Sequence, residues 1–287
     1  MKQNTLKKEY KFVGTGLHTG KVVNMTILPA PENTGIVFHR ADLGEVYIEA
    51  NALNVSKTNR STFLEKDGVQ VGTTEHLLAA FIGVGVDNAI VRADAPELPI
   101  LDGSAKLYTD AFLRDGLQTQ DAERKYFSIK EPFHWEDDAT GAVMDITPAD
   151  DFQIRIDVDF NSKVMGLQSA SYTPKSDFAK EIAPCRTFCF LHEIEPLLNA
   201  GLIQGGSLDN ALVIVENKTE YKGKEVVPGY ISNRPLMFPN ECARHKLLDV
   251  MGDFALAGKP MKAHIYAKKP GHTINTRIIR YLLENNK

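Results

Sequence analysis

Two stretches of sequence decide the fold: Thr74-Glu-His-Leu-Leu-Ala-Ala-Phe-Ile-Gly83 in the first half of the chain and Arg244-His-Lys-Leu-Leu-Asp-Val-Met-Gly252 in the second. Both place a histidine near a pair of leucines, and in both a glycine follows seven residues after the histidine. In each half a short apolar segment typical of a strand comes next. This weak internal repeat predicts two similar α+β halves. If the halves pack face to face, His76 and His245 converge from equivalent positions.

Short strands and helices are expected on either side of these stretches. The expected helices cover residues 75–83, 104–114, 239–257 and 273–284, and the expected strands cover residues 21–28, 35–39, 88–92, 126–130, 142–147, 153–160, 168–173 and 262–267. Thr73 or Thr74 can cap the first helix. Polar residues dominate from Gln118 to Lys125. We interpret this segment as a linker between domains at residues 1–122 and 123–287.

Composition narrows the class of protein. The chain has 287 residues, of which 43% are hydrophobic and 24% charged, and its net charge of −4 gives no reason to expect a nucleic-acid partner. The N-terminus lacks the apolar core of a signal peptide, and the longest apolar run, residues 77–86, is too short to span a bilayer. Three cysteines indicate no disulfide framework. We therefore expect a soluble, cytoplasmic protein without a transmembrane segment.

The pair His245 and Asp249 is the strongest local signal for chemistry. Residues four apart lie on one face of a helix, so an imidazole and a carboxylate can hold one cation there. With a third ligand from elsewhere, a zinc ion would keep its fourth position open for water, as in catalytic zinc sites. Glu75-His76 supplies the complement, a histidine ligand beside a carboxylate that can act as a general base. Alone, each motif is common on protein surfaces.

Two further segments carry candidate residues. His272 follows a glycine at the start of an expected helix, where it can donate a proton to a leaving amine. Residues 190–203 look like an insertion with apolar side chains at near-helical spacing, which predicts a short amphipathic helix. These side chains are Phe190, Leu191, Ile194, Leu197, Leu198 and Leu202.

A rival metal site uses the cysteines. Cys185, Cys189, Cys242 and His245 could form a closed, structural zinc site. Cys185 and Cys189 span a predicted strand, however, and residues four apart in a strand lie far from each other. The sequence therefore favours the site around His245 and Asp249.

A series of short motifs runs through the chain in a fixed order. In the first half they are Gly14-Thr-Gly-Leu-His-Thr-Gly20, Thr74-Glu-His-Leu77, Gly85-Val-Asp-Asn88, Asp94-Ala-Pro-Glu97 and Leu101-Asp-Gly-Ser104. In the second half they are Arg186-Thr-Phe188, Gly205-Gly-Ser-Leu-Asp-Asn210, Arg244-His-Lys-Leu-Leu-Asp249, Gly252-Asp253 and Gly271-His272. No single motif is decisive, but by their number and order the chain resembles the UDP-3-O-acyl-N-acetylglucosamine deacetylase family of lipid A synthesis.

The resemblance implies two domains, each a small β-sheet with two helices, and an active site between them. The enzyme would be a zinc-dependent amidohydrolase that removes the N-acetyl group from UDP-3-O-(3-hydroxyacyl)-N-acetylglucosamine and releases acetate, the committed step of lipid A synthesis. His76, His245 and Asp249 would bind one Zn²⁺ per chain.

The resemblance also assigns roles to the other candidates. Glu75 would be the general base and His272 the general acid, with Asp253 orienting His272. Thr187 would stabilise the oxyanion of the tetrahedral intermediate. Lys246 is expected among the catalytic residues and would also contact the substrate's phosphates. The other expected substrate-binding residues are Phe160 for the uracil, Phe188 for the sugar, Leu197, Leu198 and Leu202 for the acyl chain, and Lys269.

The chain departs from the family at one position, and three alternatives stay open. Cys189 stands where the family has glycine, and its thiol could narrow the entrance to the acyl passage. The same ligands would also accept iron(II) or cobalt. A binding protein with a structural zinc is a different class, although Glu75 and His272 argue against it because binding alone needs neither. The chain could also be part of a longer enzyme, since some family members carry a fused dehydratase domain.

Overall fold

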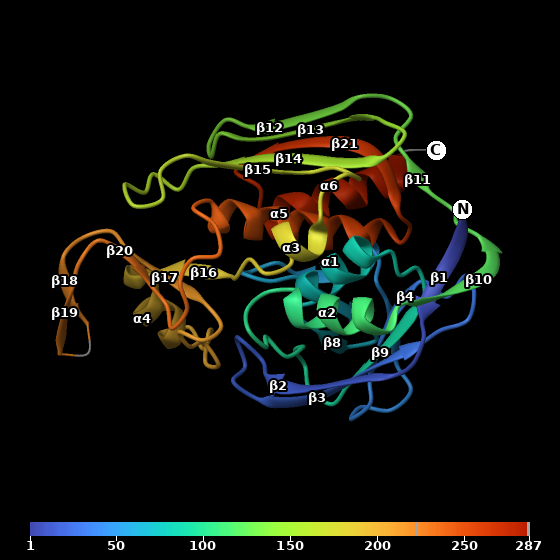
Figure 1. The fold of residues 1–287 in the computed structure, drawn as a ribbon, viewed down its shortest axis with the longest axis horizontal. Coiled ribbons are helices and arrows are strands. Elements are labelled where there is room, and N and C mark those ends of the chain that lie inside the picture. The colour runs from blue at the N-terminus through green and yellow to red at the C-terminus, as the bar shows by residue number, and fades with distance from the viewer. Residues whose placement is uncertain (222, 286–287) are drawn as a thin grey trace.

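The computed structural model describes residues 1–221 and 223–285, in which two β-sheets face each other across layers of helices (Figure 1). The first sheet has the strand order β2-β3-β9-β4-β5. Its strands are β2 (Tyr10–Thr15), β3 (Val22–Pro29), β4 (Ile36–Arg40), β5 (Tyr47–Glu49) and β9 (Ala89–Ala93). Two helices, α1 (Glu75–Val84) and α2 (Lys106–Asp115), precede and follow β9 in the chain.

The second sheet repeats this topology with the order β12-β13-β21-β14-β15, and β11 joins it beside β21. Its strands are β11 (Phe127–Ser128), β12 (Phe133–Asp137), β13 (Ala142–Pro148), β14 (Phe152–Val158), β15 (Gln168–Tyr172) and β21 (Met261–Lys268). Helices α5 (Glu241–Phe254) and α6 (His272–Asn285) precede and follow β21. β9 runs antiparallel to β3 and parallel to β4. In the same way, β21 runs antiparallel to β13 and parallel to β14. The expectation of two similar α+β halves is therefore confirmed.

Smaller elements join and decorate the two halves. A ribbon of β1 (Lys2–Leu6) and β10 (Leu117–Glu123) and a sheet of β6 (Val55–Lys57), β7 (Phe63–Lys66) and β8 (Val69–Val71) belong to the first half. The second half adds α3 (Phe178–Glu181), β16 (Phe188–Phe190), α4 (Leu191–Asn199), β17 (Leu212–Val215), β18 (Thr219–Tyr221), β19 (Lys224–Val226) and β20 (Gly229–Ile231). In Figure 1, α4 and β18–β19 lie to one side of the helix layers. No helix among the described residues is long and apolar enough to cross a membrane.

Helices α1 and α5 pack against each other at the centre of the molecule. Their apolar side chains belong to one buried cluster that continues into both sheets, which is the main source of cohesion between the halves. The two helices are in close contact at Gly252, where an added Cβ atom would lie only 2.0 Å from the carbonyl oxygen of Glu75. The glycine of the second repeated stretch thus sets the spacing between the helices that carry the candidate site.

The predicted linker is wrong in its local structure. Most of residues 118–125 form β10, which pairs antiparallel with β1. The side chains of this strand are exposed or half-buried, because it lies in a two-stranded ribbon. Its polar composition therefore gave no indication that its backbone pairs with another strand. β10 pairs within the first half up to Glu123, and β11 pairs within the second half. The boundary between residues 122 and 123 therefore falls at the last residue of β10, and we retain it as a proposal.

The expected capping bond is also wrong. Thr74 does occupy the residue before α1, but its side chain accepts no hydrogen bond from the helix. Its hydroxyl instead donates to the carbonyl oxygen of Thr62 at 3.2 Å. A contact with a distant loop therefore replaces the local cap.

Candidate metal and catalytic site

A cleft of about 410 Å³ opens where the N-terminal end of α1 meets the middle of α5. Both halves of the chain contribute to its walls. The lining residues are Leu17, Thr58, Asn59, Arg60, Thr73, Glu75, His76, Phe160, Thr187, Phe188, His245, Lys246, Asp249, Gly271, His272, Thr273 and Ile274. Most of the residues expected at the site from sequence therefore line one cavity.

His76, His245 and Asp249 meet at the bottom of this cleft, and all three are buried. Oδ1 of Asp249 lies 3.4 Å from Nε2 of His245 and 3.7 Å from Nε2 of His76. Among the described residues this is the one group of three or more potential ligands whose ligand atoms lie within 4.8 Å of one another. The cysteines are not part of it, which removes the support for the rival site.

The three side chains fit a cation. Oδ1 of Asp249 is buried without a hydrogen-bond partner, an arrangement that costs free energy unless another group satisfies it. His245 donates its Nδ1 hydrogen to the carbonyl oxygen of Cys185 at 3.0 Å, so its Nε2 lone pair faces the carboxylate. Burial lowers the pKa of His245 and lowers that of His76 to about 3, which keeps both imidazoles neutral as ligands must be.

The charge on Asp249 is stabilised by its neighbours. Burial opposes its ionisation, but the charges of Lys246 and His272 outweigh burial and hold the pKa of this carboxyl well below its usual range. Lys246 donates directly to Oδ2 of Asp249 at 2.5 Å. An anionic oxygen and two neutral imidazole nitrogens therefore converge on one point, the donor set that favours zinc and related divalent ions.

Glu75 and His272 flank the metal group from opposite halves of the chain. Oε1 of Glu75 lies 3.8 Å from Nε2 of His272. Burial raises the pKa of Glu75 to about 7, although the neighbouring His272 lowers it. Burial disfavours the cationic form of His272, but Asp253, Glu75 and Asp249 outweigh burial and raise its pKa to about 9. A proton acceptor and a proton donor thus stand beside the metal group at neutral pH.

Asp253 fixes the orientation of His272. Its Oδ2 accepts hydrogen bonds from Nδ1 of His272 at 2.9 Å and from the amide of Asn275 at 2.8 Å. Since a carboxylate only accepts, Nδ1 of His272 carries the hydrogen and Nε2 is directed towards Glu75.

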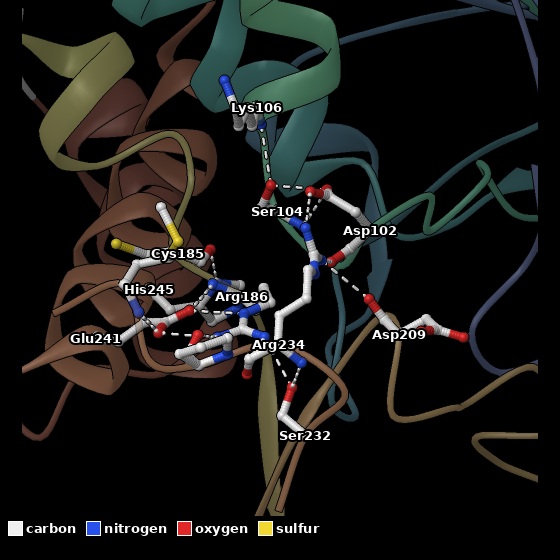
Figure 2. Close-up of polar contacts among 12 residues, drawn as sticks. Asp102, Ser104, Lys106, Cys185, Arg186, Asp209, Ser232, Arg234, Glu241 and His245 are labelled. Atoms are coloured by element: carbon white, nitrogen blue, oxygen red, sulfur yellow. Dashed lines mark hydrogen bonds and ion pairs between the residues drawn. The ribbon is translucent and has the colours of Figure 1, made fainter.

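Thr187 lines the cleft, and the residue before it, Arg186, is held by a buried ion pair. The guanidinium of Arg186 binds the carboxylate of Glu241 and the backbone carbonyls of Arg234 and Pro235, with both charged side chains essentially inaccessible (Figure 2). Glu241 lies one helical turn before His245 on α5. The ion pair therefore ties the segment that bears Thr187 to the helix that bears two of the candidate metal ligands.

A loop of the first half also contacts this segment. The backbone N–H of Thr187 donates to the carbonyl oxygen of Gly103 at 2.8 Å. Arg234 reaches the same loop through the carbonyl oxygen of Asp102 at 3.3 Å and also binds the carbonyl oxygen of Asp209 (Figure 2). Gly103 has φ = +80°, and an added Cβ atom would lie 1.7 Å from the carbonyl oxygen of Asn210, so this close docking requires glycine.

Two aromatic side chains, Phe160 and Phe188, line the cleft. Phe160 is 41% exposed, and its ring meets that of Phe188 edge to face at 5.5 Å between centroids. Phe188 in turn meets His245 at 6.3 Å. Cys189 follows with a half-buried thiol, and burial raises the pKa of this thiol to about 11.

Four of the expected substrate-binding residues lie outside the cleft walls. Lys269 contacts the carbonyl oxygen of Thr140 at 3.5 Å. The expected amphipathic helix exists as α4, but none of its residues is buried, and it ends before Leu202. Leu197, Leu198 and Leu202 are absent from the lining residues that the structure describes. An ion pair of 2.5 Å between Arg60 and Glu193 nevertheless attaches α4 to the cleft, because Arg60 is a lining residue.

Sequence reasoning missed two residues of the site. Glu241 begins a polar series at every fourth residue of α5 that continues through His245, Asp249 and Asp253, and this spacing could have revealed it. Thr62 carried no local signal, yet it contacts both Glu75 and Asp253. The fold and site define a two-domain α+β protein with a candidate His₂Asp metal site and a Glu–His pair beside it in the cleft between its halves.

The chain matches LpxC, the family of UDP-3-O-acyl N-acetylglycosamine deacetylases, over residues 3–284, and it belongs to this enzyme family. The bifunctional enzyme LpxC/FabZ of Bacteroides thetaiotaomicron is 44% identical over 98% of this chain and 64% of its own length. The enzyme of the same name from Porphyromonas gingivalis is 43% identical over 100% of this chain and 65% of its own length. The UDP-3-O-acyl-N-acetylglucosamine deacetylase of Cellvibrio japonicus is 40% identical over 99% of this chain and 91% of its own length. The chain thus spans slightly less than two thirds of the length of the two bifunctional relatives. It spans most of the length of the Cellvibrio japonicus deacetylase.

Proposed function

We propose that the chain is a zinc-dependent deacetylase that hydrolyses the N-acetyl group of UDP-3-O-(3-hydroxyacyl)-N-acetylglucosamine. The observation that carries the proposal is the unpartnered Oδ1 of Asp249, buried beside two neutral imidazole nitrogens and flanked by Glu75 and His272. Membership of the deacetylase family supports the substrate. We further propose that the reaction takes place in the cytoplasm, where UDP-linked sugars are available, as the committed step of lipid A synthesis.

In this proposal His76, His245 and Asp249 hold the metal ion. Bound there, zinc would polarise the amide carbonyl and acidify a water molecule. Glu75 accepts the proton of the attacking water, and its raised pKa suits a base that must both take and release a proton near neutrality. His272 donates a proton from Nε2 to the departing nitrogen while Asp253 stabilises the imidazolium from the other side.

The remaining roles follow from positions around the cleft. The hydroxyl of Thr187 donates to the oxygen that becomes negative in the tetrahedral intermediate, and the Arg186 and Gly103 contacts hold its backbone for that purpose. Lys246 would bind the substrate phosphates. In the structure without substrate its ammonium group donates to Asp249. The exposed ring of Phe160 offers a face for the uracil, and Phe188 lies where the sugar would be.

The insertion has the acyl-binding role in this proposal. Leu197, Leu198 and Leu202 would bind the acyl chain after α4 shifts towards the cleft, with Cys189 at the entrance. The exposure of Leu198 supports a binding rather than a packing role. Lys269 would bind phosphate only if it leaves its contact with Thr140. A dehydratase domain following this chain is proposed from the bifunctional relatives.

The test combines metal analysis with an acetate-release assay on UDP-3-O-(3-hydroxyacyl)-N-acetylglucosamine. We expect one zinc per chain and acetate release that a chelator abolishes and added zinc restores. His76→Ala should lose most of the metal and the activity, whereas a variant with all three cysteines changed to alanine should keep its zinc. Metal retained by His76→Ala and lost by the cysteine variant would contradict the ligand assignment. Tight binding of the UDP-sugar without acetate release would favour the non-catalytic alternative.

A further inference from the structure

Thr62 is a buried residue whose contacts join the two flanks of the cleft. It directly precedes β7 in the first half and is 0% exposed. Its backbone N–H donates to Oε2 of Glu75 at 3.1 Å. Its hydroxyl donates to Oδ1 of Asp253 at 2.6 Å, a bond between residues 191 positions apart in the chain. One residue of the first half therefore contacts both the base of its own half and the carboxylate that orients His272 in the second.

The hydrogen bonds of Asp253 leave no substitute for this hydroxyl. Asp253 is 0% exposed, so its oxygens must find partners within the protein. His272 and Asn275 both donate to Oδ2. Oδ1 receives only the hydroxyl of Thr62 among the hydrogen bonds of the described residues. Without that hydroxyl, Oδ1 would be a buried, unpaired anionic oxygen, and the carboxylate would gain by rotating towards the donors of Oδ2.

The same hydroxyl also faces the imidazole. Oγ1 of Thr62 lies 3.3 Å from Nδ1 of His272. Because the hydroxyl hydrogen points to Asp253, the oxygen presents a lone pair to the Nδ1 hydrogen. The ring is then held by two acceptors on one side, with Nε2 directed towards Glu75 at 3.8 Å.

The backbone of Thr62 is anchored in turn. Its carbonyl oxygen accepts the hydroxyl of Thr74 at 3.2 Å, the residue immediately before Glu75. The loop cannot move relative to the start of α1 without breaking this bond or the N–H bond to Glu75.

We propose that Thr62 is a positioning residue that aligns the Glu75 carboxylate with the Asp253–His272 pair across the boundary between the two halves. The proposal deepens the proposed deacetylase function and rests on the roles assigned there to Glu75 and His272. Thr62 acts through those two groups and does not contact the reacting amide. Outer partners of this kind typically contribute about 10- to 100-fold to activity when they hold site residues in place.

Thr62→Val tests the proposal because valine keeps the shape and the N–H but lacks the hydroxyl. We expect kcat for acetate release to fall about 10- to 100-fold, with KM and zinc content unchanged. Thr62→Ser restores the hydroxyl and should recover kcat to within a few-fold of the wild type. The matched control is Thr109→Val, since Thr109 is another fully buried threonine, and its hydroxyl donates to the carbonyl oxygen of Ala105, the residue before α2. Thr109→Val should lose about as much thermal stability as Thr62→Val but keep the wild-type kcat.

A second measurement reads the imidazole directly. In ¹⁵N-histidine NMR at one fixed pH, Thr62→Val should shift the Nδ1 resonance of His272 and speed the solvent exchange of its hydrogen, whereas Thr109→Val should leave both unchanged. Wild-type kcat in Thr62→Val, or a loss in Thr62→Ser as large as that in Thr62→Val, would overturn the positioning role. If the wild-type protein binds zinc but releases no acetate, the proposed function fails, and the NMR comparison then decides whether Thr62 orients His272.

Discussion

Replacing Gly252 with alanine should separate the two halves of the metal site. Gly252 lies where α5 crosses the start of α1, and an added Cβ atom would lie 2.0 Å from the carbonyl oxygen of Glu75. That distance must grow to at least 3.0 Å, so the helices must move apart by about 1 Å at this point. One helix carries Glu75 and His76 and the other carries His245 and Asp249, so the movement opens the ligand group.

The expected effect on activity is much larger than the effect on stability. Overpacking a core contact costs about 1–3 kcal/mol, and the better helix propensity of alanine returns about 1 kcal/mol. A net loss of about 0–2 kcal/mol lowers Tm by at most about 8 °C for a chain of this size. Misplacing catalytic groups by about 1 Å, in contrast, can cost about 100-fold in rate. Gly252→Ala should therefore fold but lose about 100-fold in kcat/KM and bind zinc more weakly.

Gly83→Ala is the matched control, because Gly83 occupies the equivalent position of the first repeated stretch. Its added Cβ atom would lie 2.1 Å from the ring of Phe178, a side chain, and not from the backbone beneath a site residue. This variant should lose a similar amount of stability, measured by thermal unfolding, but keep zinc and most of its acetate release. A folded Gly252→Ala protein with wild-type zinc affinity and kcat/KM would refute the reasoning that this crossing sets the geometry of the site.

Three further predictions concern other parts of the site. The pH profile of kcat/KM should be bell-shaped, because the rate rises as Glu75 loses its proton and falls at higher pH as His272 loses its proton. Glu75→Gln should remove the acidic limb and His272→Gln the basic limb. A variant that keeps a normal rate and both limbs would contradict the role of the residue it replaces. Cys189→Phe should reduce kcat/KM on acylated substrate and barely change it on the unacylated UDP-sugar, whereas equal losses on both would remove the tunnel interpretation. Arg186→Met should lower the free energy of unfolding, measured in urea, by about 3–5 kcal/mol because Glu241 is left charged and buried. Adding Glu241→Leu should recover much of that loss, and an unchanged unfolding midpoint in the single variant would contradict this reasoning.

Local sequence patterns were sufficient wherever one element's own chemistry determined its structure. The repeated stretches formed α1 and α5, and the strand after each took the same place in its sheet. The insertion formed an amphipathic helix as predicted. These predictions rest on residues within a few positions of one another, where helix and strand periodicities act directly.

Composition failed where backbone pairing or distant contacts decided the outcome. The polar segment ending in Glu123 became a strand because β1 offered it a partner, and Thr74 gave its hydroxyl to a loop instead of its helix. Neither partner can be identified from the neighbouring residues.

The sequence by itself determined the two similar halves, the candidate ligands and the acid and base candidates. Only the tertiary structure decided that His76 meets Asp249 within 3.7 Å, that Glu75 faces His272 at 3.8 Å, and that Thr62 joins these groups. The physical reason is that these contacts connect residues between 13 and 210 positions apart. Local propensity cannot specify such pairs, whereas the packing of α1 on α5, enforced by a shared apolar core and by the absence of a side chain at Gly252, brings them together.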